Sequence, residues 1–301
     1  MNPVLLIDTN YLCHRAFHAM EDLFYGDRGT GAVFGVLRDI VSLTEEFKTN
    51  RVVFAFDVGG GGHRRGILPT YKGTRAARHA TDTPEDQEAR KNFFEQVVLL
   101  RTRYLPAAGF RNVFSCAGFE ADDIIAAIAA ALPATDEGVI VSADQDLWQC
   151  MRANVWCWNL HTRRATTAEV FRERWGLEPH EWADVKAYAG CSTDDVPGVP
   201  GVGEATAARW LRGELGAHTQ AFQKIRAARA LYRRNLPLVR LPFPGTPQFE
   251  IQRDEVTEKS WQQLTEDLGM HSIRDTVPRG TKRSSRGRRR GQGEEGFGFD
   301  G

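Results

Sequence analysis

The sequence predicts an α/β protein built on a parallel sheet. Three apolar runs, at residues 4–8, 51–57 and 138–144, are rich in branched or aromatic residues, and each ends in an aspartate. Runs of this length without polar alternation are typical of strands buried on both faces, as in a parallel sheet. Segments with helical spacing of apolar residues separate the runs, and this alternation favours helices on both faces of the sheet.

The remaining elements are predicted from shorter patterns. Residues 110–116 and 154–159 are weaker strand candidates, and 35–47 and 121–132 are expected to be helices. Thr83, followed by Pro84, predicts a capped helix that runs to about Leu105. Its expected buried side carries Phe93, Phe94, Val97, Val98 and Leu100. Residues 166–212 are expected to be helical with glycine-rich turns, and the prolines beyond Leu236 predict irregular structure.

Length and composition predict a globular protein with two folded units. The chain has 301 residues, a formal net charge of +0 and 42% hydrophobic residues, which excludes a fibrous or disordered protein. We expect a core at 1–165, a helical subdomain with a C-terminal wrap at 166–278, and a basic disordered tail at 279–301. The longest apolar stretch has nine residues, at 124–132, which is too short for a membrane span.

Cysteine usage and the N-terminus indicate the cellular compartment. The five cysteines lack C-x-x-C spacing, which argues against a disulfide framework and against a zinc site. No signal peptide is visible at the N-terminus, so a reducing cytoplasm is the expected location.

Charge is distributed unevenly along the chain. Residues 279–291 contain seven basic groups and no acid, whereas residues 1–278 carry 32 basic and 36 acidic groups. Two interpretations of the basic segment stay open, namely a nonspecific DNA tether and a solubilising extension.

Several acidic residues are expected to converge at one edge of the sheet. Asp8, Asp57 and Asp144 each follow a predicted strand, and ligands bind beyond the carboxyl ends of strands in open parallel sheets. Further candidates are Glu120, Asp122, Asp123, Asp146 and Asp194. Such acids repel one another unless cations neutralise them. Oxygen ligands without paired histidine or cysteine suit Mg²⁺ or Mn²⁺, and two such ions about 4 Å apart support in-line displacement at phosphate.

Basic and aromatic residues lie close to these acids in the sequence. Arg64, Lys72 and Arg75 follow the second predicted strand and are candidates to hold a phosphodiester, and Arg15 is a further candidate after the first strand. Tyr71 offers a ring that could stack on an unpaired base.

Taken in order, these motifs resemble the 5′ nuclease family of flap endonucleases and 5′-3′ exonucleases, which includes the N-terminal domain of bacterial DNA polymerase I. The matching segments are Asp8 with 15–18, Phe56-Asp57 with Arg64, Tyr71-Lys72 and Arg75, Glu120-Ala121-Asp122-Asp123, residues 142–146, and residues 190–203. The resemblance implies a PIN-like nuclease core with a helical arch at about 73–83 and a helix–hairpin–helix-type subdomain. It implies hydrolysis near the 5′ ends, flaps or nicks of DNA, with RNA primers or RNA–DNA hybrids as further substrates, by a monomer acting in replication or repair.

The resemblance also implies a role for each candidate. Asp8, Asp57, Glu120, Asp122 and Asp123 would serve one divalent ion, and Asp144, Asp146 and Asp194 would serve the second. Lys72 and Arg75 would act as electrophilic and phosphate-positioning groups. The loop of Gly198, Val199, Gly201, Val202 and Gly203 would bind the duplex backbone and K⁺, since glycines allow close approach to phosphate.

Three positions depart from the family pattern. Cys191 stands where aspartate is usual, which predicts a weaker second metal site, and Asp195, where asparagine is usual, is expected to compensate in part. Ala205 stands where a lysine is usual, which predicts weaker binding to duplex phosphate.

Three other functions account for parts of the sequence. A toxin-like ribonuclease of similar fold would be shorter, and a D-x-D phosphatase would need an aspartate where Asn10 stands. The alternative that stays open is a structure-selective DNA-binding protein with a degenerate site, which Cys191 and Ala205 favour.

Overall fold

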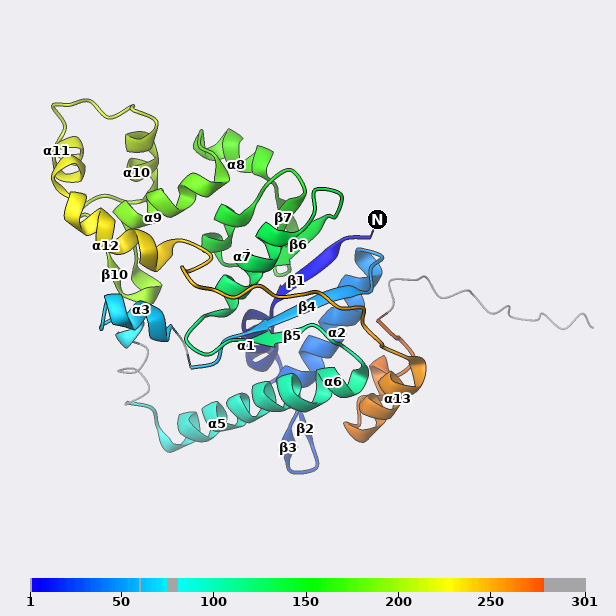
Figure 1. Ribbon diagram of the computed structural model, residues 1–301. Helices are drawn as coiled ribbons and strands as arrows, with labels where there is room; N and C mark the ends of the chain where they lie inside the picture. The colour runs from blue at the N-terminus through cyan, green and yellow to red at the C-terminus, as the bar shows by residue number, and fades with distance from the viewer. Residues whose placement is uncertain (1, 60, 75–80, 279–301) are drawn as a thin grey trace, which may run out of the picture.

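The computed structural model describes residues 2–59, 61–74 and 81–278. Within this part of the chain, the centre is a six-stranded sheet in the order β5-β4-β1-β6-β7-β8 (Figure 1). The first five strands are parallel, and β8 is antiparallel to β7. The strands are β1 (Val4–Asp8), β4 (Arg51–Phe56), β5 (Val113–Ser115), β6 (Gly138–Val141), β7 (Val155–Asn159) and β8 (Arg164–Thr166). Two short antiparallel pairs lie apart from it, β2 (Phe24–Tyr25) with β3 (Arg28–Gly29) and β9 (Gly190–Cys191) with β10 (Val196–Pro197).

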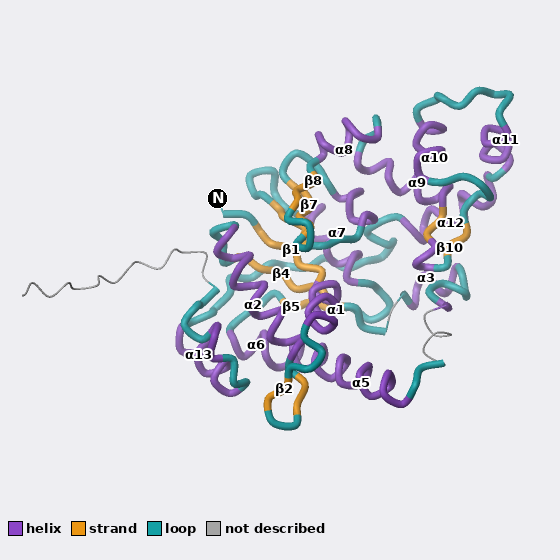
Figure 2. The backbone as a smooth tube through the Cα atoms, turned by 180° about the vertical axis from the view of Figure 1, so that it is seen from behind, coloured by secondary structure: helices purple, strands orange, loops and turns teal. Residues whose placement is uncertain are grey.

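Helices cover both faces of this sheet, as Figure 1 and Figure 2 show from opposite sides. On one side lie α1 (Thr9–Ala19), α2 (Gly31–Glu46), α5 (Pro84–Leu99), α6 (Leu105–Ala108) and α13 (Glu258–Asp267). On the other lie α7 (Ala121–Ala131), α8 (Ala168–Trp175), α9 (Trp182–Ala189), α10 (Glu204–Leu211) and α11 (Gln220–Ala227). Two more helices, α3 (Gly62–Ile67) and α12 (Arg229–Val239), lie near β9–β10. The predicted α/β class with a parallel sheet is confirmed.

Alternation along the strands divides the core into two layers. Leu5 and Ile7 pack with α1 and α2, whereas Val4 and Leu6 pack with α7, because successive side chains of a strand point to opposite faces. All four side chains are fully buried. This two-sided burial explains why the strand sequences are continuously apolar.

The C-terminal part of the chain returns to the sheet. The backbone N–H of Gln252 donates to Asn112 Oδ1 at 2.7 Å, and the N–H of Arg111 donates to Asp254 Oδ1 at 2.7 Å. Beyond this segment, Trp261 of α13 is buried in the same cluster as α1 and α2. Residues 252–273 therefore pack on the sheet core, while the division of the chain at 165/166 stays a prediction.

Some local predictions need correction. Phe93, Val97 and Leu100 are buried, but Phe94 and Val98 are 54% and 47% exposed, because only one face of α5 meets the sheet layer. The regular helix ends at Leu99 and continues as a π-turn, Leu100–Tyr104, before α6. Pro237 lies inside α12 rather than in irregular structure.

Two predictions concern residues outside the described part of the chain. Arg75 and most of the expected arch fall within 75–80, and the basic tail is 279–301. No helix in the described part is long and apolar enough to cross a membrane.

Candidate metal-binding active site

Strand order brings three of the predicted acids to one rim. Asp8 ends β1, which lies between β4 and β6, so Asp57 and Asp144 follow its two neighbours in the sheet. Asp8 caps α1 by accepting from the Tyr11 N–H at 3.0 Å, and its other oxygen accepts from Ser142 Oγ at 2.8 Å. Asp57 Oδ1 accepts from the Ala121 N–H at 2.6 Å, which joins this rim to the start of α7.

Asp8, Asp57, Asp122 and Asp144, called here the four-carboxylate cluster, repel one another. Burial, together with the charges of Asp57 and Asp144, raises the pKa of Asp8 to about 7, although the hydrogen bonds from Tyr11 and Ser142 lower it. Burial also raises the pKa of Asp122 well above its ordinary value, with contributions from the other three acids. Acids held together under repulsion fit a divalent cation, since the ion would supply the missing positive charge.

Asp123 and Arg64 form a buried ion pair behind this cluster. Arg64 is 2% exposed, and its guanidinium donates to Asp123 Oδ2 at 2.6 Å and Oδ1 at 2.8 Å. Asp123 also accepts from the N–H groups of Glu120 and Phe243, at 3.0 and 2.8 Å. Four hydrogen bonds use all the acceptor positions of a carboxylate. Asp123 is therefore not available as a metal ligand and Arg64 is not available to bind phosphate, which corrects both predictions.

Tyr71 and Glu120 are also held inside the protein. The Tyr71 ring is 2% exposed, so it offers no surface for base stacking, which corrects that prediction. Its hydroxyl donates to Glu120 Oε2 at 2.7 Å and to Asp194 Oδ2 at 3.2 Å. Glu120 further pairs with Arg64 at 3.2 Å and with Lys72. With these partners, Glu120 is suited to orient the side chains of Lys72 and Arg64, and water, rather than to bind metal directly.

Lys72 and Arg15 have different surroundings. Lys72 has a positive φ of 54° and its N–H donates to the Asp194 carbonyl at 3.0 Å. Burial lowers the pKa of Lys72, but Asp194 and Glu120 raise it more, so the ammonium stays charged beside the acids. Arg15 instead pairs with Asp39 of α2, which corrects its assignment to phosphate binding.

Asp146, Cys191 and Asp194, called here the second cluster, lie next to the rim. One ligand atom from each lies within 4.8 Å of the other two. Burial raises the pKa of the Cys191 thiol, and its Sγ lies 3.0 Å from Thr193 Oγ1. A neutral thiol is a poor ligand for Mg²⁺, so only Asp146 and Asp194 of this cluster offer the oxygen donors that this ion prefers.

Asp195 and Lys186 change the expected picture of the second cluster. Asp195 Oδ2 accepts from the N–H and the hydroxyl of Thr74, at 2.8 and 2.9 Å. Asp195 is not a member of the second cluster, so it does not supply the carboxylate that Cys191 lacks. Lys186 Nζ lies 3.0 Å from Asp146 Oδ1, a contact that is not among the sequence-based predictions. The sequence does carry a signal for this ion pair, because Lys186 lies in the apolar stretch of α9 and a charge buried there needs a charged partner.

The glycine-rich loop combines buried side chains with exposed backbone. Val199 and Val202 are 4% exposed, so only their backbone can face a ligand, whereas Gly201 and Gly203 are exposed. Gly201 has φ +79°, and a Cβ at Gly198 would lie 2.0 Å from the Ala189 carbonyl oxygen. The local geometry therefore requires glycine at 198 and 201. Gly203 is the N-cap of α10, so this helix begins at the surface.

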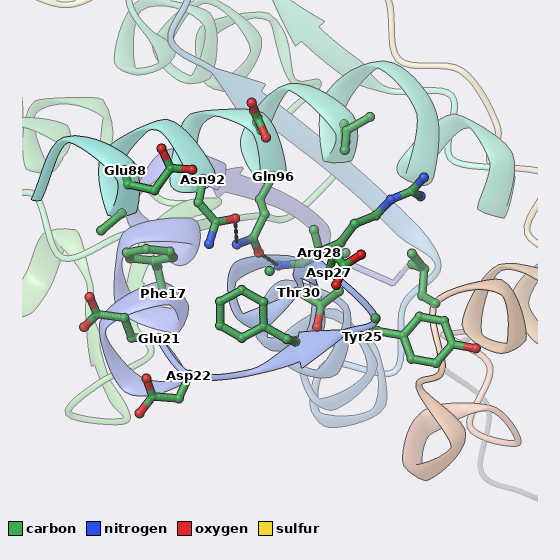
Figure 3. A pocket seen from close by; sticks show the side chains of 18 of the residues that line it. Phe17, Glu21, Asp22, Tyr25, Asp27, Arg28, Thr30, Glu88, Asn92 and Gln96 are labelled. Atoms are coloured by element: carbon green, nitrogen blue, oxygen red, sulfur yellow. Dashed lines mark hydrogen bonds between the residues drawn. The ribbon is translucent and has the colours of Figure 1, made fainter. Parts of the chain in front are cut away.

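A cavity of about 830 Å³ lies between the β2–β3 hairpin, α5 and the end of α13 (Figure 3). Its lining carries many acids, namely Glu21, Asp22, Asp27, Glu85, Glu88, Glu95 and Asp267, and one arginine, Arg28. This charge repels a polyanion, so the cavity is unsuited to bind a phosphate backbone.

A mostly parallel sheet whose strand ends carry clustered carboxylates is suited to bind divalent ions, and such ions support hydrolysis at phosphate. Residues 3–176 match the family model described as the 5′-3′ exonuclease N-terminal resolvase-like domain. The chain belongs to this family, which confirms the resemblance and the hydrolase class found from the sequence.

Similar proteins agree with this assignment. DNA polymerase I of Mycobacterium bovis is 32% identical over 238 residues, which cover 75% of this chain and 24% of that protein. The thermostable DNA polymerase I of Thermus thermophilus is 33% identical over 227 residues, which cover 74% and 25%. The chain thus spans about a quarter of the length of these relatives.

Solved structures share the fold. The T5 5′-exonuclease with bound zinc has a TM-score of 0.68 at 21% identity, covering 91% of this chain and 99% of that one. The T5 D15 flap endonuclease in complex with DNA and metal ions has a TM-score of 0.66 at 21% identity, covering 90% and 96%.

Proposed function

We propose that the chain is a metal-dependent 5′-3′ exonuclease and 5′-flap endonuclease that hydrolyses phosphodiester bonds in DNA. The four-carboxylate cluster carries this proposal, because it places repelling acids at the sheet edge where ligands bind. Family membership and the metal-bound and DNA-bound T5 structures support it. Removal of RNA primers from RNA–DNA hybrids, by a monomer in replication or repair, completes the proposal.

In this mechanism two Mg²⁺ or Mn²⁺ ions, when bound, would activate the attacking water and stabilise the leaving oxygen. The four-carboxylate cluster would hold one ion, and Asp146 with Asp194 would contribute to the other. Lys72 stays protonated against Glu120 and Asp194, so it would supply a fixed positive charge to a phosphate bound at this rim.

The glycine-rich loop is the proposed duplex-binding element. Backbone groups at Gly201 and Gly203, at the exposed start of α10, would contact phosphate and a K⁺ ion. Such contacts select for shape and backbone position and carry no sequence information.

A labelled flap substrate tests the proposal. A duplex with a 5′ flap, labelled at the 5′ end in one sample and at the 3′ end in another, should be cut in Mg²⁺ or Mn²⁺ and left intact in EDTA. The two labels separate flap release from stepwise exonuclease products. Binding without cleavage in both metals would contradict the nuclease proposal.

The second candidate is a DNA-binding protein with a degenerate site. The protonated thiol of Cys191 and the contact of Lys186 with Asp146 favour it, since both weaken the second cluster as a metal site. The same flap assay decides between the two functions.

Replacing Cys191 by aspartate is expected to strengthen metal binding. A third carboxylate beside Asp146 and Asp194 adds charge and an oxygen ligand, so the Mg²⁺ concentration for half-maximal cleavage should fall about tenfold. A Mg²⁺ titration of the initial rate measures this, with Cys116→Asp, at a half-buried cysteine outside both clusters, as the control. An unchanged half-maximal concentration would contradict the role given to Cys191.

A further inference from the structure

A buried lysine lies against the second cluster. Lys186 of α9 is 8% exposed, and its Nζ lies 3.0 Å from Asp146 Oδ1 and 3.1 Å from Glu204 Oε1. The ammonium also lies 6.0 Å from the centre of the buried Trp182 ring. These partners hold the charge in one place, unlike the charge of a solvated surface lysine.

Both acids of the second cluster therefore lie near a protein cation. Asp146 faces Lys186, and Asp194 lies 3.7 Å from Lys72 Nζ. The third member, Cys191, is a thiol with Thr193 as its neighbour. A divalent ion entering here would meet two carboxylates whose charge is already offset by one lysine each. The four-carboxylate cluster offers four acids, of which Asp57 and Asp122 share the charge of Lys72.

We propose that Lys186 is a positioning residue that supplies a resident positive charge to the second cluster and sets its affinity for divalent ions. The protein accordingly binds one ion tightly, at the four-carboxylate cluster, and a second ion at least about tenfold more weakly. This inference rests on the proposed metal-dependent function and concerns how its two ion sites differ. Lys186 acts through Asp146 and does not contact substrate.

Direct counting of bound Mn²⁺ tests this inference without measuring activity. The whole chain is titrated with Mn²⁺, and free Mn²⁺ is followed by electron paramagnetic resonance. Wild-type protein should show one tight and one weak ion. Lys186→Met keeps the aliphatic stem and removes the charge, so the second ion should bind about tenfold more tightly or better while the first is unaltered.

Two further variants separate charge from packing. Lys186→Arg keeps the positive charge and should keep the second ion weak. Glu204→Gln removes the other partner of Lys186 and leaves the contact with Asp146, so it should also keep the second ion weak.

Two outcomes would overturn the inference alone. One is two ions of equal affinity in the wild-type protein, a result that requires no variant to fold. The other is an unchanged second affinity in a Lys186→Met protein whose first ion still binds normally. Absence of any Mn²⁺ binding would overturn the proposed metal dependence as well, so the two failures are distinguishable.

Discussion

Replacing Asp144 by alanine is expected to lower the cleavage rate by more than about 100-fold while DNA affinity is retained. Loss of a residue that hydrogen-bonds to a metal ligand costs about 10- to 100-fold in metal affinity or activity, and loss of a proposed direct ligand should cost more. The charge of Asp144 acts on Asp8, Asp122 and Asp146, so this one carboxylate links the four-carboxylate cluster to the second cluster. Single-turnover cleavage of the flap substrate measures the rate, and fluorescence anisotropy in Ca²⁺ measures binding.

Asp136→Ala is the matched control for this experiment. Asp136 lies just before the opposite end of β6 and pairs with Arg51 at 2.6 Å, far from the carboxyl-end rim. Its loss should leave the rate within about twofold of wild type, as expected for a site outside the machinery. Retention of full cleavage by Asp144→Ala would contradict the assignment of Asp144 to the site.

Replacing Arg64 by methionine is expected to lower the free energy of unfolding by about 3–5 kcal/mol. The change leaves Asp123, which is 0% exposed, as a buried charge without its cation, and breaking one side of a buried pair costs about this much. The Arg64 Nε–H also donates to the Leu238 carbonyl at 2.8 Å, so α12 loses a contact. Urea denaturation followed by circular dichroism measures the loss.

The neighbouring arginine provides the control. Arg65 is exposed, and Arg65→Met should cost less than about 1 kcal/mol. The double variant Arg64→Met with Asp123→Asn removes both charges and keeps an acceptor, so it should recover part of the lost stability. A loss below about 1 kcal/mol in Arg64→Met alone would show that the buried pair does not stabilise the fold.

Strand positions and their terminal acids could be predicted from the sequence because their cause is local. Continuous apolar runs identify buried parallel strands, and parallel strands place their carboxyl ends at one edge. Asp8 and Asp57 therefore lie at the strand ends where the sequence predicts them. They accept hydrogen bonds from Ser142, which follows β6, and from Ala121, which begins α7.

The partners of the basic residues could not be predicted in the same way. The pairing of Arg64 with Asp123 joins residues 59 positions apart, and a motif alone does not distinguish a buried arginine from a phosphate ligand. The burial of Tyr71 beneath Glu120 and Asp194 likewise depends on segments 49 and 123 residues away. Contacts over such separations follow from tertiary packing, which residue spacing does not encode.

Anomalous diffraction from crystals soaked in Mn²⁺ tests most directly whether the four-carboxylate cluster binds divalent ions. We predict a Mn²⁺ peak within coordination distance, about 2.0–2.4 Å, of carboxylate oxygens from Asp8, Asp57, Asp122 or Asp144. Mn²⁺ peaks confined to other parts of the surface, with none at this rim, would contradict the account.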